Sequence, residues 1–484
     1  MMTAFACKLK MSYNLFLLAF ALGIGGGFQY GLQVSVINSP AEYIKSFIHE
    51  TWVRRYGFSA TEELITLMWS FIVSIYSIGG LLGALSAGYL SVRFGRKKTM
   101  LLANIPTVLS AALMGLSRLC GSFEMIIAGR LFSGMGGGLA LNIHIMFAGE
   151  CAPRNLRGQL AITASTAIAL GKFTGFALGL REVLGVDALW PVLMAAHAVP
   201  ALVQLLTLPF FPDSPRYLLI DKKDKEGCIK AVKKLWGDGD HMAEIDDMLA
   251  EQEAIHGERA KSVCDLFRDQ AVRWQLITLF LVVSCMQFIG INVVYFYAYN
   301  VFIKAGIPHA QTHYVSLGIG ITEILTTVVS GSLIERAGRK TLLWKSHTVM
   351  ALALGLLTVT LSLQSQAAPQ ALPAGVSCSL PTEIFLQSYR PAAYVLNGAS
   401  NWSQLFILGL LFPFIVDGLG SFCFIIFLIY CLSTAIFVFV VMPETKGKTM
   451  LQVTEEFNRL NYRGKKRQTA LQQTNCSVTT VTRL

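Results

Sequence analysis

Long apolar runs alternate with short polar connections along most of this chain. A helix needs about 20 apolar residues to cross the hydrocarbon core of a bilayer, and eleven runs approach or exceed that length. Six precede a polar stretch from Pro212 to about Ala271 and five follow it. The expected spans are 14–36, 64–90, 99–117, 122–148, 159–180, 189–211, 274–303, 313–334, 342–364, 392–416 and 420–442. The pattern predicts an all-α integral membrane protein.

Basic residues gather in alternate connections between these runs. They are Arg93, Arg96, Lys97 and Lys98 after the second run, Arg154 and Arg157 after the fourth, and Arg336, Arg339 and Lys340 after the eighth. Because short cytosolic loops carry an excess of Lys and Arg, these loops, the long polar stretch and the N-terminus are expected in the cytosol. The connection 38–63 is mixed in sign and is expected outside.

Composition narrows the class of protein. Of the 484 residues, 54% are hydrophobic and only 14% charged, whereas a soluble domain carries about 25% charged residues. The net charge of +11 lies in short loops and not beside interleaved aromatic residues. A soluble enzyme and a nucleic-acid partner are therefore excluded, the lipid bilayer is the expected environment, and nothing in the chain calls for a metal or cofactor.

Three sequence anchors occur twice in the same order. Arg93-Phe-Gly-Arg-Lys recurs as Arg336-Ala-Gly-Arg-Lys, and Pro212-Asp-Ser-Pro-Arg as Pro443-Glu-Thr-Lys-Gly. Glu150, with Arg154 and Arg157, is echoed by Glu383 with Arg390. Such duplication is typical of transporters built from two parallel six-helix repeats.

The second repeat is shorter than the first. Fifty-seven positions separate Arg93 from Glu150, whereas 47 separate Arg336 from Glu383. The missing residues fall in the stretch Gln364 to Pro381, which holds three prolines and little aliphatic bulk. We expect the tenth helix to be shortened or re-entrant, with its defect around 365–387, and the C-terminal tail to stay on the cytosolic side.

The motifs together resemble the facilitative hexose transporters of the sugar-porter branch of the major facilitator superfamily. Those that carry the likeness are Phe28-Gln-Tyr-Gly, Asn38-Ser-Pro, Arg93-Phe-Gly-Arg-Lys, Gly129-Arg130, Glu150 to Arg157-Gly158, Pro212-Asp-Ser-Pro-Arg-Tyr, Gln287 with Asn292, Glu335-Arg-Ala-Gly-Arg, Asn401-Trp402 and Pro443-Glu-Thr-Lys-Gly-Lys-Thr. The match runs from about Gly25 to Asn461, and Val283-Ser284-Cys285 resembles the fructose-related class II branch.

The resemblance implies a division of the chain around a central cavity. Residues 1–13 would be a cytosolic N-terminus, 14–211 and 272–442 two six-helix bundles, 212–271 a cytosolic helical linker, and 443–484 a cytosolic tail. Within the linker, Ile229, Val232 and Leu235, and later Ile245, Met248 and Leu249, have helical spacing with charged residues between them.

Charged residues at helix ends are candidates for a cytosolic gate. Arginines beside glutamates form bidentate ion pairs, and in the family such pairs would lock the outward-open state. The candidates are Arg93, Arg96, Glu150, Arg157, Arg216, Glu335, Arg336, Arg339, Glu383, Arg390 and Glu444. The alternative is that the basic residues serve membrane topology only.

A neutral sugar needs paired donors and acceptors in a mostly apolar cavity. The resemblance implies substrate contacts from Gln33, Ser165, Gln287, Asn292, Phe296, Glu323, Asn401 and Trp402. Gln287 and Asn292 can face one cavity only if the helix loosens near Gly290; otherwise they make ordinary interhelical hydrogen bonds. Trp402 could equally be a packing residue. Proton-coupled relatives carry an aspartate where Gln33 stands, which favours uniport.

Two further features lie inside the spans. Small residues at i, i+4 spacing, Gly79, Gly83 and Ala87 beside Gly80, Ala84 and Gly88, predict close helix packing. Lys172 and Glu323 are intramembrane charges, and an unpaired one costs at least about 2.5–3.5 kcal/mol. They could form an ion pair between the two halves, or Lys172 could attract an anionic substrate such as urate. The alternative is a snorkelling lysine and a hydrogen-bonded glutamate.

The expected function is therefore facilitative transport of a hexose by alternating access, in a multi-pass plasma-membrane protein. Two alternatives stay open: a transport-dead or regulatory splice form, because the tenth span is short, and a sugar sensor or receptor that does not transport. The sequence leaves open the choice among fructose, glucose and urate, and the oligomeric state.

Overall fold

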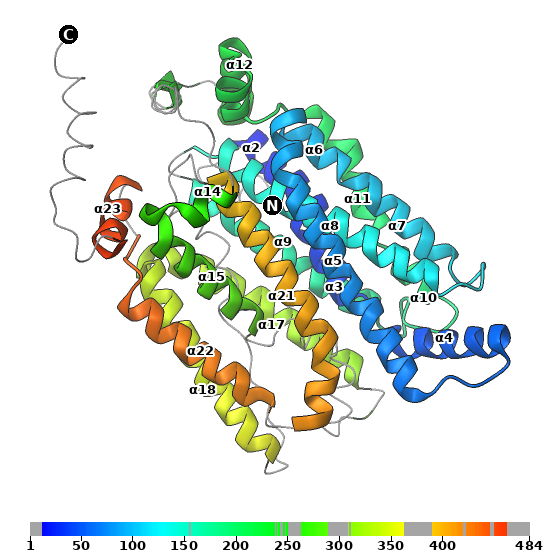
Figure 1. The fold of residues 1–484 in the computed structure, drawn as a ribbon. Coiled ribbons are helices and arrows are strands. Elements are labelled where there is room, and N and C mark those ends of the chain that lie inside the picture. Colours follow the sequence, from blue (N-terminus) through cyan, green and yellow to red (C-terminus); the bar gives the residue numbers. More distant parts are fainter. Residues whose placement is uncertain are drawn as a thin grey trace, which may run out of the picture.

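Helices make up every regular element that the structure, a computed structural model, describes (Figure 1). The described residues are 12–153, 156–237, 239, 241–242, 245–246, 248–249, 263–288, 308, 311–362, 390–419, 423–445 and 450–461. The structure contains no strand over these residues, in agreement with the predicted all-α class.

The first half contains a helix over each of the first six expected spans. Its elements are α2 (Tyr13–Gly23), the π-helical turn η1 (Ile24–Phe28), α3 (Gln29–Ser35), α4 (Ala41–Tyr56), α5 (Glu62–Phe94), α6 (Arg96–Leu102), α7 (Asn104–Leu116), α8 (Glu124–Cys151), α9 (Arg157–Leu178), α10 (Trp190–Ala195), α11 (Ala198–Thr207) and η2 (Leu208–Phe210). The sequence did not predict the polar helix α4, because charged residues lie between its apolar positions. The residues that α4 buries are Ala41, Ile44, Ile48 and Thr51.

The rest of the chain continues with short linker helices and a second set of long ones. These are η3 (Tyr217–Asp221), α12 (Lys225–Trp236), α14 (Val263–Arg268), η4 (Gln270–Val272), α15 (Arg273–Phe288), α17 (Thr312–Ala337), α18 (Arg339–Ser362), α21 (Arg390–Leu419), α22 (Cys423–Val440) and α23 (Met450–Asn461). We call the end of the molecule that carries α12 and α14 the linker end, and the end that carries α4 the far end (Figure 1).

Six helical runs in the described part of the chain are long and apolar enough to cross a membrane. They are Tyr13–Ser35, Glu62–Phe94, Arg96–Leu116, Glu124–Cys151, Trp190–Phe210 and Gln270–Phe288. Shorter apolar stretches, Ile162–Leu178 and Phe424–Val440, lie in α9 and α22.

The two small-residue stripes of α5 face different helices. A Cβ on Gly79 or Gly83 would lie 2.0 or 2.3 Å from the backbone oxygen of Leu131 or Met135, so this stripe packs backbone to backbone against α8 of its own half. The other stripe faces α21 of the second half, where a Cβ on Gly80 would lie 2.2 Å from the Trp402 ring. The predicted close packing is confirmed, and one stripe contributes to the contact between halves.

The linker forms a small apolar cluster of its own. Asp224 caps α12 by accepting a hydrogen bond of 2.8 Å from the backbone N–H of Gly227. Val232 and Leu219 are buried with Ile245 and Met248 in one cluster. The predicted amphipathic periodicity of this region is therefore reproduced over the described residues.

Both ends of the described chain are bound to the linker region. The Asn14 amide donates a hydrogen bond of 2.7 Å to the Lys234 carbonyl, and the Gln270 amide donates one of 3.4 Å to the Asn461 carbonyl. The far-end part of α18 lies against the start of α22, where a Cβ on Gly355 would touch Leu428, whereas α21 begins at the linker end. The end of α18 and the start of α21 therefore lie at opposite ends of the molecule; the predicted defect at 365–387 lies outside the described residues.

Candidate functional site

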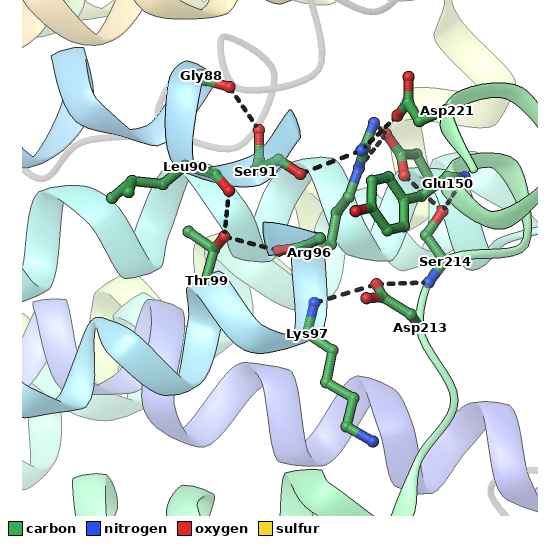
Figure 2. Close-up of polar contacts among 12 residues, drawn as sticks. Gly88, Leu90, Ser91, Arg96, Lys97, Thr99, Glu150, Asp213, Ser214 and Asp221 are labelled. Carbon is green, nitrogen blue, oxygen red and sulfur yellow. Dashed lines mark hydrogen bonds and ion pairs between the residues drawn. The ribbon is translucent and has the colours of Figure 1, made fainter. Parts of the chain in front are cut away.

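The loop that carries the first repeated motif, Arg93-Phe-Gly-Arg-Lys, takes part in a cluster of charged side chains at the linker end, which we call the clamp (Figure 2). Arg96 begins α6 directly after Gly95, whose φ of +92° favours glycine. The Arg96 guanidinium donates to Glu150 Oε1 from Nε and a terminal nitrogen at 3.1 and 2.9 Å, and to Asp221 Oδ2 at 2.7 Å. It also lies over the Tyr217 ring, 4.6 Å from the centroid. The clamp joins α6, α8 and η3.

Asp213 binds the start of α6 in the same clamp. Its Oδ1 accepts hydrogen bonds from the backbone N–H groups of Lys97, at 3.1 Å, and Ser214, at 2.8 Å. Ser214 Oγ in turn donates to Glu150 Oε2. A carboxylate at a helix N-terminus satisfies otherwise unpaired N–H groups, so the loop before η3 holds α6 and α8 together.

The second half repeats this carboxylate geometry. Glu444 accepts hydrogen bonds from the backbone N–H groups of Lys340 and Thr341 at 3.4 Å each, and from Thr445 at 3.0 Å. Gly338, like Gly95, has a positive φ, +84°, and a Cβ there would lie 2.6 Å from Glu444. Glu444 therefore occupies the position of Asp213, and the duplicated motifs correspond in three dimensions.

The gate candidates are only partly brought together among the described side chains. Arg96 and Glu150 meet, and Glu444 holds the second loop. Arg93 is exposed and donates instead to the Tyr89 hydroxyl, at 2.6 Å, on its own helix. Arg216 directly precedes η3. The side chains of Arg157, Glu335, Arg336, Arg339 and Arg390, and all of Glu383, lie outside the described residues.

Sequence reasoning missed three members of the clamp. Asp213, Ser214 and Asp221 were not assigned to the gate, although Asp213 and Ser214 lie in the repeated Pro212-Asp-Ser-Pro-Arg motif. The correspondence of Asp213 with Glu444 was the signal that could have found them. Asp221 lies outside any repeated motif and gave no such signal.

An aromatic cluster fills the middle of the interface between the halves. Trp402 of α21 is 1% exposed and meets the rings of Tyr30 and Tyr76 edge-on, with centroids 5.6 and 5.5 Å apart. Tyr76 donates a hydrogen bond of 3.2 Å to Gln33 Oε1. Trp402 is thus a packing residue in this conformation, directly beside the candidate Gln33.

The remaining sugar-site candidates divide between two places. The Gln287 amide donates to Asn401 Oδ1, which joins α15 and α21 within the second half. Ser165 is buried in α9, and its hydroxyl has no hydrogen-bond partner among the described residues. Asn292 and Phe296 lie outside the described residues. The hydrogen bond between Gln287 and Asn401 pairs two of the predicted polyol-binding groups with each other.

Lys172 and Glu323 form an ion pair between the halves. Lys172 Nζ of α9 lies 2.9 Å from Glu323 Oε1 of α17, and the two side chains are 7% and 13% exposed. The predicted inter-half pair is therefore present. A small pocket lies between α3, α9 and α17 toward the far end, lined by Ser35, Asn38, Phe176, His313 and Ser316 among others.

Solved structures share this architecture. The structure titled as the proton:xylose symporter XylE bound to 6-bromo-6-deoxy-D-glucose has a TM-score of 0.76 at 23% identity, covering 92% of this chain and 99% of that one. The inward open conformation of XylE from E. coli gives 0.69 at 23% identity with the same coverage. Identities this low establish the fold alone, which is that of a major facilitator superfamily membrane protein.

Sequence relatives define the family. Residues 18–457 match the family described as "Sugar (and other) transporter". Human solute carrier family 2, facilitated glucose transporter member 11 is 44% identical over 459 residues, 91% of this chain and 92% of the relative. Member 5 from Equus caballus is 40% identical over 453 residues, 90% of each. The chain belongs to this sugar transporter family and is a transporter, not an enzyme, and the predicted class II sugar-porter resemblance is confirmed.

Proposed function

We propose that this protein carries a hexose down its concentration gradient by alternating access, with the sugar bound between the two bundles. The observation that supports it most is the repeated clamp, Asp213 on the Lys97 and Ser214 N–H groups and Glu444 on those of Lys340 and Thr445. Asp213 binds the start of α6 within the first half, and Glu444 binds the start of α18 within the second half. Two halves held internally in this way can rock as rigid bodies about a site between them.

Neutral polar side chains are suited to bind the sugar. Gln287 and Asn401 engage each other, as do Tyr76 and Gln33 Oε1, whereas Gln33 Nε2 is buried without a hydrogen-bond partner among the described residues. Amide and phenol groups can exchange these bonds for bonds to sugar hydroxyls at little net cost, because donor and acceptor are replaced in kind. Asn292 and Phe296 complete the proposed set.

The pairing of Lys172 favours a neutral substrate over urate. Glu323 lies 2.9 Å from the ammonium group, so the positive charge that could attract an anion is already compensated. Uniport is favoured by the first span, where Gln33 stands without any acidic residue between Tyr13 and Ser35. The buried Arg130 donates a hydrogen bond of 3.0 Å to the Gln33 backbone carbonyl. This acceptor, unlike a carboxylate, cannot take up a proton during transport.

The linker contacts support the proposed orientation in the plasma membrane. Asn14 and Asn461 are both bonded to the linker region, and the basic loops lie at that end. By the positive-inside rule the linker end, with Asn14 and Asn461, would face the cytosol. Arg96 and Glu150 pair within the first half, and the gate between the halves on the cytosolic side would be completed by Arg157, Arg216, Glu335, Arg336, Arg339, Glu383 and Arg390.

Transport is tested by uptake of labelled fructose, glucose and urate into proteoliposomes. We expect saturable hexose uptake that an imposed proton gradient leaves unchanged. Gln287→Ala should raise KM about tenfold, the equivalent of one hydrogen bond of about 1.4 kcal/mol. Gln275→Ala is the matched control, a buried glutamine of the same helix that contacts Asn461 at the linker end, and it should leave KM unchanged.

The short spacing around the expected tenth helix favours one competing function, a transport-dead or regulatory form. The spacing of 47 rather than 57 positions between repeated anchors supports it. Hexose binding without uptake by the well-inserted protein would contradict transport and support a sensor. Neither binding nor uptake would support the transport-dead form.

A further inference from the structure

The two halves contact each other along two helix pairs of different chemistry. We call α9 with α17 the charged seam and α5 with α21 the glycine seam. Among ion pairs whose side chains are both described, Lys172–Glu323 alone joins the two halves. The pair lies in the middle part of α17, and one turn away the two helices approach closely, since a Cβ on Gly320 would lie 3.1 Å from the Phe173 Cα.

The far end of the charged seam is held by a weaker contact. The Tyr314 hydroxyl donates a hydrogen bond of 2.7 Å to Glu182, in an exposed position. Tyr314 and Glu323 are nine positions apart, which is roughly 14 Å along a helix. In a rigid rotation an atom moves in proportion to its distance from the axis, so a rotation centred near the ion pair separates Tyr314 from Glu182 while hardly stretching Lys172–Glu323.

Breaking the ion pair in every cycle would be costly. Both charges are almost fully buried, and separated charges in a low-dielectric interior lose an attraction that water does not replace. The Tyr314–Glu182 bond, by contrast, exchanges for bonds to water. Rocking that leaves the pair intact and opens the exposed contact has the lower barrier.

We infer that Lys172 and Glu323 are the pivot of the transport motion: an ion pair that stays formed in the outward-open and inward-open states while the bundles rock about it. The inference rests on the proposed function, alternating access. Lys172 and Glu323 act here as positioning residues, which hold the axis of rotation at one depth of the charged seam.

Two engineered disulfides test the pivot. Phe173→Cys with Gly320→Cys places the Cβ atoms about 3.4 Å apart beside the ion pair, close to the spacing that disulfides require. Gly88→Cys with Val395→Cys is the matched lock at the linker end of the glycine seam, where a Cβ on Gly88 would lie 3.1 Å from Val395 Cγ2. Both are made in the Cys120→Ser background, since Cys120 is exposed, and linkage is verified by mass spectrometry.

Each protein is compared oxidised and reduced by two readouts. One is hexose uptake. The other is hydrogen exchange of residues 160–164, whose Ile162 packs against the second-half cluster at the linker end; this records opening without requiring transport. The lock beside the pair should change both by less than about threefold, whereas the linker-end lock should lower both by about tenfold or more, reversibly on reduction.

The outcomes separate the pivot from the proposed function. If the lock beside the ion pair slows hydrogen exchange as strongly as the linker-end lock, the pivot is wrong. If the reduced protein takes up no hexose but its exchange still responds only to the linker-end lock, the pivot stands and the transport proposal fails. The charge swap Lys172→Glu with Glu323→Lys should restore at least part of the uptake lost by either single reversal; no recovery would also overturn the pivot.

Discussion

The two seams between the halves solve the same packing problem with opposite chemistry. In the glycine seam, small residues let α5 approach α21 closely: Gly80 lies against the Trp402 ring and Ala84 against Gly398. In the charged seam, Lys172 and Glu323 meet at 2.9 Å. Dispersion contacts between apolar groups are weakly directional, whereas a buried ion pair fixes one geometry. One seam is thus suited to sliding and the other to holding position.

Removal of the lysine should break the charged seam and give the largest effect. In Lys172→Met the Glu323 carboxylate loses its ammonium partner inside the membrane, which costs about 3–5 kcal/mol for a buried pair. We expect a large drop in thermal stability in detergent, measured by fluorescence-detected size exclusion. Lys172→Met combined with Glu323→Gln should recover most of the loss, because no charge is then left unpaired. Equal stability of wild type and the single variant would show that the pair does not hold the seam.

Crowding should disturb the glycine seam by an intermediate amount. A Cβ on Gly80 would lie 2.2 Å from the Trp402 ring, and overpacking of this kind costs about 1–3 kcal/mol. Gly80→Ala should therefore lower stability and uptake, and a smaller residue in place of Trp402 should relieve it. Gly88→Ala is the control, because its nearest contact is a Val395 methyl at 3.1 Å. Equal stability of the Gly80→Ala and Gly88→Ala variants would contradict the close contact between Gly80 and the Trp402 ring.

Loss of the far-end contact should have the smallest effect. The hydrogen bond from Tyr314 lowers the pKa of Glu182, so the bond favours the ionised carboxylate and contributes only while Glu182 is ionised. Tyr314→Phe should change uptake by less than about threefold, since exposed contacts of this kind are weak. The difference from wild type should vanish as the pH falls below the pKa of Glu182. A difference that persists in acid would assign another role to Tyr314.

Much of the fold could be predicted from the sequence because a membrane restricts the secondary structures that can span it. An apolar run of helical length has few alternatives to a spanning helix, and each of the eleven expected runs overlaps a helix. The polar helix α4 was missed because no apolar run marks it. The pair Lys172–Glu323 was predictable as a hypothesis because two charges inside spans require partners.

Other parts of the site could not be read from the sequence. Gln33 was a candidate by position, but its bond with Tyr76 and the wedge of Trp402 between Tyr30 and Tyr76 depend on how α21 packs on α3 and α5. Likewise, the recurrence of Arg93 in the repeat suggested a gate residue, yet the structure directs it to Tyr89 on its own helix. Repetition identifies a loop, whereas the orientation of a side chain depends on its neighbours.

The amino-acid sequence by itself determined the membrane class, the duplicated architecture and the family, because hydropathy and repeated motifs are local properties that each segment carries wherever it lies. The tertiary structure alone decided which stripe of α5 faces which helix, that Asp213 and Glu444 hold equivalent loops, and where the two intramembrane charges meet. These are contacts between segments up to 322 positions apart, as between Gly80 and Trp402, and their geometry exists only once the helices have packed.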